Sequence, residues 1–163
     1  MKRLAALLIA ATLAGCAAYQ PVPEGYAGPI ARISDSGQSE DGTKAKVFAL
    51  SAVDGNSIRD SFRASAAASH NRGATLILQV VSREVPAQPM KVTLKASHIT
   101  GAPIHAMASK VAGTFFSVEG TVDFSPKANG SYVVKGELKK GGSSVWIEDA
   151  DTGQPVTEKV VEK

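Results

Sequence analysis

The sequence predicts an all-β domain, an antiparallel β-sandwich of about seven strands with at most one short helix, preceded by a signal peptide and a flexible tether. Apolar residues recur with period two over most of the second half of the chain, as they do when successive strand side chains point to opposite faces. Turn dipeptides separate these runs. We therefore expect a signal peptide over 1–15, a lipidated N-terminus and tether over 16–28, and the β-sandwich over 29–163.

The N-terminus has the composition of a secretory signal peptide. Lys2 and Arg3 precede an apolar stretch, 4–13, that is too short to cross roughly 30 Å of hydrocarbon as a helix. The four residues Leu-Ala-Gly-Cys at 13–16 resemble the lipobox of bacterial lipoproteins. That resemblance implies cleavage between Gly15 and Cys16, lipid attachment through the Cys16 sulfur, and acylation of the new amine.

The alternative interpretation of the N-terminus is an ordinary secreted protein with a stray thiol. A spare, unpaired thiol is a liability in an oxidising compartment, so a secreted protein whose single cysteine has no role is not expected. Two or more acyl chains hold a protein on a membrane, so we expect the membrane to be a partner through Cys16. By analogy with lipoprotein sorting, alanine at position 17 favours the outer membrane, with the domain facing the periplasm and an envelope protein as a possible further partner.

Residues 17–28 follow the cysteine and are rich in proline and glycine, with little apolar periodicity. Such a segment predicts a tether, and twelve residues reach at most about 40 Å. Once Lys2 and Arg3 are removed with the signal, basic and acidic residues are nearly balanced. There is no basic stripe with interleaved aromatic residues, so we expect no nucleic-acid partner.

Six segments have the apolar pattern of strands. In five of them apolar residues alternate or are mixed with polar ones. The segment 75–81 is almost wholly apolar and predicts a strand covered on both faces. The pairs Asp54-Gly55 and Asn129-Gly130 supply the positive φ angles of tight turns beside two of these segments. The predicted strands are 45–53, 75–81, 90–97, 116–124, 132–138 and 144–148.

One segment, 56–69, has helical rather than strand spacing. Three apolar residues lie four apart on one face, although four serines weaken the pattern because serine competes for backbone hydrogen bonds. We expect a short helix across the end of the sandwich, with Asn56 as its N-cap and Gly73 near its end. The three apolar residues are Ile58, Phe62 and Ala66. The stretch 101–113 fits either a strand or a crossing loop.

The chain is also similar over roughly 43–156 to a family of uncharacterised Gram-negative lipoproteins. The similarity rests on the order and spacing of six short segments, since no single motif is diagnostic. It implies a small β-sandwich on a lipid tether and no accepted activity. The segments are FALSAVDG at 48–55, NRG at 71–73, VPA at 85–87, API at 102–104, YVVKGEL at 132–138 and SVWIED at 144–149.

No catalytic or metal-binding motif stands out in the sequence. The histidines lack a His-Glu-x-x-His spacing, and no Gly-x-Ser-x-Gly elbow or phosphate-binding loop occurs. We therefore expect no enzyme activity, no cofactor and no metal, and a domain that acts as a binding or scaffolding module. The alternative is a periplasmic metal-binding or hydrolytic accessory protein that uses His70, His98 or His105 with Asp149 or Asp151 near predicted loop ends.

Two further features carry weaker predictions. Asp149 and Asp151 precede Gly153 in part of a calcium-loop pattern, but the pattern lacks the distal glutamate, so a polar hairpin tip is favoured. Arg72, between Asn71 and Gly73, is either a recognition residue or, as favoured in a tight sandwich, a salt-bridge anchor.

Overall fold

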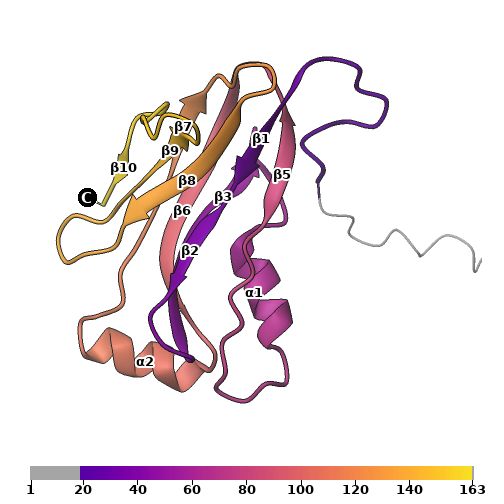
Figure 1. Cartoon of the computed structure of the whole chain (residues 1–163). Coiled ribbons are helices and arrows are strands. Elements are labelled where there is room, and N and C mark those ends of the chain that lie inside the picture. The colour runs from indigo at the N-terminus through magenta and orange to yellow at the C-terminus, as the bar shows by residue number, and fades with distance from the viewer. Residues whose placement is uncertain (1–18, 163) are drawn as a thin grey trace, which may run out of the picture.

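Two β-sheets face each other across a shared apolar core in the computed structural model, which describes residues 19–162 (Figure 1). The predicted signal peptide and the predicted lipid attachment at Cys16 lie outside the described residues. The sandwich is β-rich as predicted, but it contains ten strands and two helices rather than about seven strands and at most one helix. Within the described residues, no helix is both long and apolar enough to cross a membrane.

The first sheet has the strand order β10-β9-β8-β1-β5. Its strands are β1 (Ile30–Ser34), β5 (Ser82–Pro86), β8 (Ser131–Glu137), β9 (Ser144–Asp149) and β10 (Val160–Val161). The pair β1–β8 is parallel and the other pairs are antiparallel, so the predicted purely antiparallel topology is wrong for this sheet. The parallel pair arises because a strand at the start of the chain is inserted between β8 and β5.

The second sheet has the order β2-β3-β6-β7, with β4 paired to β3, and is antiparallel throughout. Its strands are β2 (Ser36–Ser39), β3 (Lys44–Val53), β4 (Asn56–Ser57), β6 (Met90–Thr100) and β7 (Ser117–Phe124). Residues that alternate along β6 point into the core, and Val92 and Leu94 are fully buried there. The period-two segments at 45–53, 90–97, 116–124, 132–138 and 144–148 are thus confirmed as strands.

Asp35 stands at the point where the chain passes from the first sheet to the second, between β1 and β2. Its carboxylate is fully buried and accepts two hydrogen bonds from the Arg83 guanidinium of β5, at 2.8 and 2.7 Å. It also accepts the backbone N–H of Leu50 at 3.0 Å and both the N–H and the hydroxyl of Ser61 at 2.9 and 2.8 Å. One side chain therefore connects both sheets and the first helix.

A helix, α1 (Ser61–Ser69), does form within the predicted segment, but it begins later than predicted and buries Ser61, Ala64, Ser65 and Ser69 instead of the predicted apolar row. Asp60, not Asn56, is the N-cap, and its carboxylate accepts the N–H of Arg63 at 2.9 Å. Asn56 instead belongs to the short strand β4. Helix α1 ends at His70 rather than near Gly73.

The serines that weakened the helical pattern form a regular row on α1. Ser61, Ser65 and Ser69 lie four residues apart, and their hydroxyls accept the backbone N–H groups of residues 81, 79 and 77 at 2.9, 2.9 and 2.8 Å. Four residues of helix rise about 6.0 Å and two residues of extended chain span about 6.6 Å, so the two repeats nearly match. We call this row the serine ladder.

The serine ladder explains why the predicted strand at 75–81 is wrong. The segment is extended, but its backbone pairs with helix hydroxyls instead of a neighbouring strand, and it belongs to neither sheet. It is covered only in part, since Leu76, Ile77 and Leu78 are half-buried and Val80 is 52 % exposed. An apolar composition alone cannot distinguish a buried strand from a segment lying beside a helix.

The second helix, α2 (Pro103–Val111), occupies the stretch for which the sequence left strand or loop open. Pro103 is in the first turn, where a missing N–H costs nothing. None of its residues is buried, and its large apolar side chains point outward: Ile104, Met107 and Val111 are 71, 67 and 92 % exposed. Helix α2 lies at the end of the sandwich opposite the start of β1, where the tether enters (Figure 1).

Both sheets and the buried apolar cluster lie within the described residues. Every strand lies between Ile30 and Val161, and the buried apolar cluster runs from Ala31 to Ile147. The chain from Tyr19 onward therefore includes both sheets and the whole of this core. Pro21, within the segment predicted as a tether, is buried.

Candidate functional site

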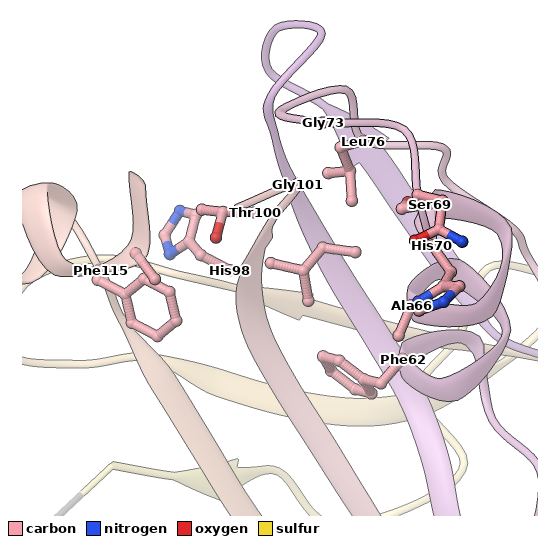
Figure 2. A pocket seen from close by; sticks show the side chains of 13 residues that line it. Phe62, Ala66, Ser69, His70, Gly73, Leu76, His98, Thr100, Gly101 and Phe115 are labelled. Atoms are coloured by element: carbon pink, nitrogen blue, oxygen red, sulfur yellow. The ribbon is translucent and has the colours of Figure 1, made fainter. Parts of the chain in front are cut away.

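A cavity of about 430 Å³ lies where the C-terminal end of α1, the end of β6 and α2 come together (Figure 2). Phe62, Ala66 and His70 come from α1 and its end on one side of the cavity. The side chains of His98, near the end of β6, and of Phe115 lie at the other side in this view (Figure 2). A volume in this range is typical of small-molecule sites.

The walls of the cavity contain no carboxylate, lysine or arginine side chain. Apolar surface comes from Phe62, Leu76, Ile99, Ala106 and Phe115. Serine, threonine, asparagine and histidine supply the polar part, and no Asp, Glu, Lys or Arg is among the lining residues. Apolar walls with a few polar groups are the usual composition of a ligand pocket.

The loop after α1 is held tightly over the end of β6. The N–H of Leu76 donates to the carbonyl of Gly42 at 2.8 Å, and the N–H of Gly101 donates to the carbonyl of Thr43 at 2.9 Å. A Cβ atom at Gly101 would overlap the carbonyl of Ala74, so only glycine permits this close approach. The cavity therefore has a fixed wall on this side.

Asn71 and Gly73 give the loop its shape. Both adopt positive φ angles, 59° and 64°, which asparagine and glycine tolerate best. Arg72, between them, is exposed, and no carboxylate of the described residues lies within ion-pair distance of it, so the predicted salt-bridge anchor is wrong. Its surface position leaves the guanidinium in water beside the cavity loop.

His98 is the most buried of the three histidines, with its side chain 3 % exposed. The N–H of Phe116 donates to Nδ1 at 3.0 Å, so the proton of the neutral ring is on Nε2, which faces Glu40 Oε1 at 3.5 Å. Burial, reinforced by Lys44, holds the pKa of His98 below 6.5, although Glu40 acts in the opposite direction. The imidazole is therefore a neutral part of the wall near pH 7.

Glu40 joins His98 to two lysines at the edge of the second sheet. Its carboxylate lies 3.5 Å from Lys44 Nζ and 3.4 Å from Lys46 Nζ. Partial burial raises the pKa of Glu40, but Lys44, His98 and Lys46 together hold it below 4.5. The carboxylate is already shared among these cations, so it is poorly placed to serve as a metal ligand.

The structure does not bring the three histidines into one metal site. His70 and His98 both line the cavity but stand apart across the end of β6 (Figure 2), and His105 is half-buried in α2. Within residues 19–162, no group of three His, Cys, Asp or Glu side chains could hold a metal ion. The metal-binding alternative thus gains no geometric support from these residues.

Asp149 is the last residue of β9 and Asp151 lies in the turn that follows, at the opposite end of the sandwich from α2 (Figure 1). Asp149 Oδ1 accepts the N–H groups of Asp151 and Thr152 at 3.1 and 2.9 Å, together with the Thr152 hydroxyl. The Thr152 N–H is the main reason that the pKa of Asp149 lies below 3.8. This carboxylate organises its own turn, as the hairpin-tip interpretation predicted.

The buried polar group around Asp35 was missed by sequence reasoning. Asp35, Arg83 and Ser61 are far apart in the chain, and none stands in a recognisable motif. A weak signal was available: the acidic residue interrupts the alternation between the strands on either side of it. Ser61 is fully buried, which makes this group a structural junction.

The chain was also compared with protein-family models, with curated proteins and with solved structures, and none of the three comparisons gives a match.

Proposed function

We propose that this protein is a lipid-anchored lipoprotein of a Gram-negative envelope whose non-catalytic β-sandwich acts as a binding module, with the cavity as its binding site. The observation that carries the binding role is the cavity itself: about 430 Å³, largely apolar, and bounded by a loop that packs closely against Gly101. Support for the anchor comes from the lipobox-like residues 13–16 and the proline-rich tether that follows.

The arrangement of the domain fits a membrane anchor. The tether joins β1 at one end of the sandwich, whereas α2 and the cavity lie at the other end (Figure 1, Figure 2). A strand of eleven residues such as β6 is about 36 Å long, so the cavity would stand well away from the lipid surface. A ligand could then reach the cavity from the periplasm without entering the membrane.

The metal-binding or hydrolytic alternative rests on fewer observations. It requires His70, His98 or His105 to act with Asp149 or Asp151, and the two aspartates lie at the far end of the sandwich (Figure 1). Calorimetric titration with zinc, copper and calcium distinguishes the two proposals, because a binding module of the proposed kind gives no saturable heat with any of them.

The binding role can be tested on the protein purified from membranes. Native mass spectrometry should show a bound small molecule on the wild type, absent from Ala66→Leu, whose larger side chain enters the cavity. Ala67→Leu is the matched control, since Ala67 is exposed on the same helix and does not line the cavity. Equal occupancy in both variants, or none in the wild type, would contradict the proposal.

A further inference from the structure

The chemistry of the cavity walls limits the class of ligand, and the argument rests on the binding role proposed above. A charge moved from water into an apolar cavity costs several kcal/mol unless a partner of opposite charge meets it there. No Asp, Glu, Lys or Arg lines this cavity, and His98 is held neutral near pH 7. An ionised group inside would therefore meet no carboxylate, ammonium or guanidinium group on the walls.

Two lysines come near the cavity without lining it. Lys95 Nζ lies 5.7 Å from the centre of the Phe62 ring, and Lys110 Nζ lies 5.3 Å from the centre of the Phe115 ring. Both ammonium groups are thus engaged with aromatic rings that form the walls. Together with Arg72 in the loop after α1, they favour an anion, and the comparison of a neutral with an anionic probe below measures their combined effect.

Most polar groups of the walls already have partners. The Ser69 hydroxyl accepts the N–H of Ile77 at 2.8 Å, and the Thr100 hydroxyl donates to the carbonyl of Ala102 at 3.0 Å. Both ring nitrogens of His98 face protein groups, Phe116 and Glu40. The polar side chains that remain for a ligand are those of His70 and Asn71, both exposed at the loop after α1.

From these observations we infer that the cavity takes an uncharged molecule with an aromatic or alkyl body and one hydrogen-bonding group. The body lies among Phe62, Leu76, Ile99 and Phe115, and the polar group reaches the His70–Asn71 loop. The volume suits a molecule of two rings or a short alkyl chain. Two phenylalanines provide offset or edge contacts to a ring.

Two fluorescent probes with the same aromatic body test this class. N-phenyl-1-naphthylamine is neutral and carries one N–H, whereas 1-anilinonaphthalene-8-sulfonate adds a sulfonate charge. Titration into the chain from Tyr19 onward, which includes both sheets and the core, should give saturable binding of the neutral probe at least tenfold tighter than of the sulfonate. Ala66→Leu should abolish that binding and Ala67→Leu should leave it unchanged.

Each other outcome has a defined meaning. If the sulfonate binds equally or more tightly and Ala66→Leu blocks it, the uncharged class is wrong while the cavity remains the binding site. Binding that survives Ala66→Leu but is lost in Met107→Ser belongs to the exposed face of α2 and overturns the inference. If neither probe binds, the ligand class is overturned, and the mass measurement on membrane-purified protein decides the binding role separately.

Discussion

Asp35 and Arg83 form a bidentate ion pair across 48 residues of sequence, with the carboxylate fully buried and the guanidinium 9 % exposed. The pair lies where the chain changes sheets, and the same carboxylate holds the N-terminal residue of α1. It therefore determines how β1, β5 and α1 meet. An exposed pair, Lys91–Asp123, offers a direct comparison, because both of its side chains lie mostly in water.

Asp35→Asn should lower the free energy of unfolding by about 3–5 kcal/mol, because it leaves the buried guanidinium without its countercharge. Asp123→Asn should cost less than about 1 kcal/mol, because water screens the exposed pair. Urea unfolding of both variants measures the difference. Similar losses in the two variants would show that the buried pair is not the junction described here.

Ser65→Ala should remove the middle contact of the serine ladder. The N–H of Gln79 loses its acceptor at 2.9 Å, and an unpaired backbone group of this kind costs about 1–2 kcal/mol. Hydrogen exchange should show faster exchange at Gln79 with little change in β6. Restoration of protection by Ser65→Thr would confirm the hydroxyl as the cause, whereas unchanged exchange in Ser65→Ala would refute the ladder.

The stability of the protein should fall as the pH falls through the slightly acidic range. The pKa of His98 is lowered by burial, so below its ordinary value of 6.5 the unfolded chain takes up a proton that the folded chain resists. Protons then favour the unfolded state, and the free energy of unfolding decreases as the pH falls below about 6.5. Above that range His98 contributes no pH dependence.

Replacement of His98 by glutamine isolates this effect. The variant should be less stable overall, but its free energy of unfolding should vary less with pH over the same range, because glutamine does not titrate. The pKa of Glu40 is lowered from 4.5, so its contribution is lost only at more acidic pH and does not interfere. Parallel pH profiles for the two proteins would contradict the assignment.

Gly101→Ala should cost about 1–3 kcal/mol, because the new methyl group overlaps the carbonyl of Ala74 and forces the loop away. The same variant should weaken neutral-probe binding, since that loop forms one wall of the cavity. Gly42→Ala is the matched control, because a Cβ there meets nothing within 4 Å. A Gly101→Ala protein with unchanged thermal stability would show that the loop moves freely.

The proposed lipid anchor leads to a prediction that needs no structural detail. The intact mass of membrane-extracted protein should equal residues 16–163 plus a multiply acylated cysteine, and Cys16→Ser should remain unprocessed or be mislocalised. An unmodified mass would mean a soluble periplasmic domain, while the cavity and its tests would stand as they are.

The strands that sequence reasoning found are those whose own residues carry the pattern. In β6, for example, Val92 and Leu94 alternate with polar residues, so burial on one face is visible without knowing the partner. In contrast, β2 contains only serine, glycine and glutamine, and it becomes a strand because β3 offers it a backbone to pair with. Pairing of that kind leaves no trace in local composition.

The candidate site likewise has a part that the local sequence predicts and a part that depends on contacts between distant segments. His98 continues the alternating series of Met90 to Ala96, which places it on the buried side of β6, and it is buried there. The cavity, however, depends on the end of α1, the end of β6 and a helix that the sequence left open between strand and loop. Residues such as Ala66 and Gly101 carry no chemical signal, and their importance follows only from what packs against them.

The serine ladder also limits how the protein can vary in length. A helix repeat of about 6.0 Å falls short of an extended-chain repeat of about 6.6 Å by roughly 0.6 Å at each contact. Three contacts tolerate this difference, but a fourth would be displaced by almost 2 Å relative to the first. A longer α1 could therefore not hold a longer neighbouring segment, and a single-residue insertion within 77–81 would turn the wrong N–H groups toward the hydroxyls. Insertions in this part of the chain are expected to be accommodated only in the loop between His70 and Leu76.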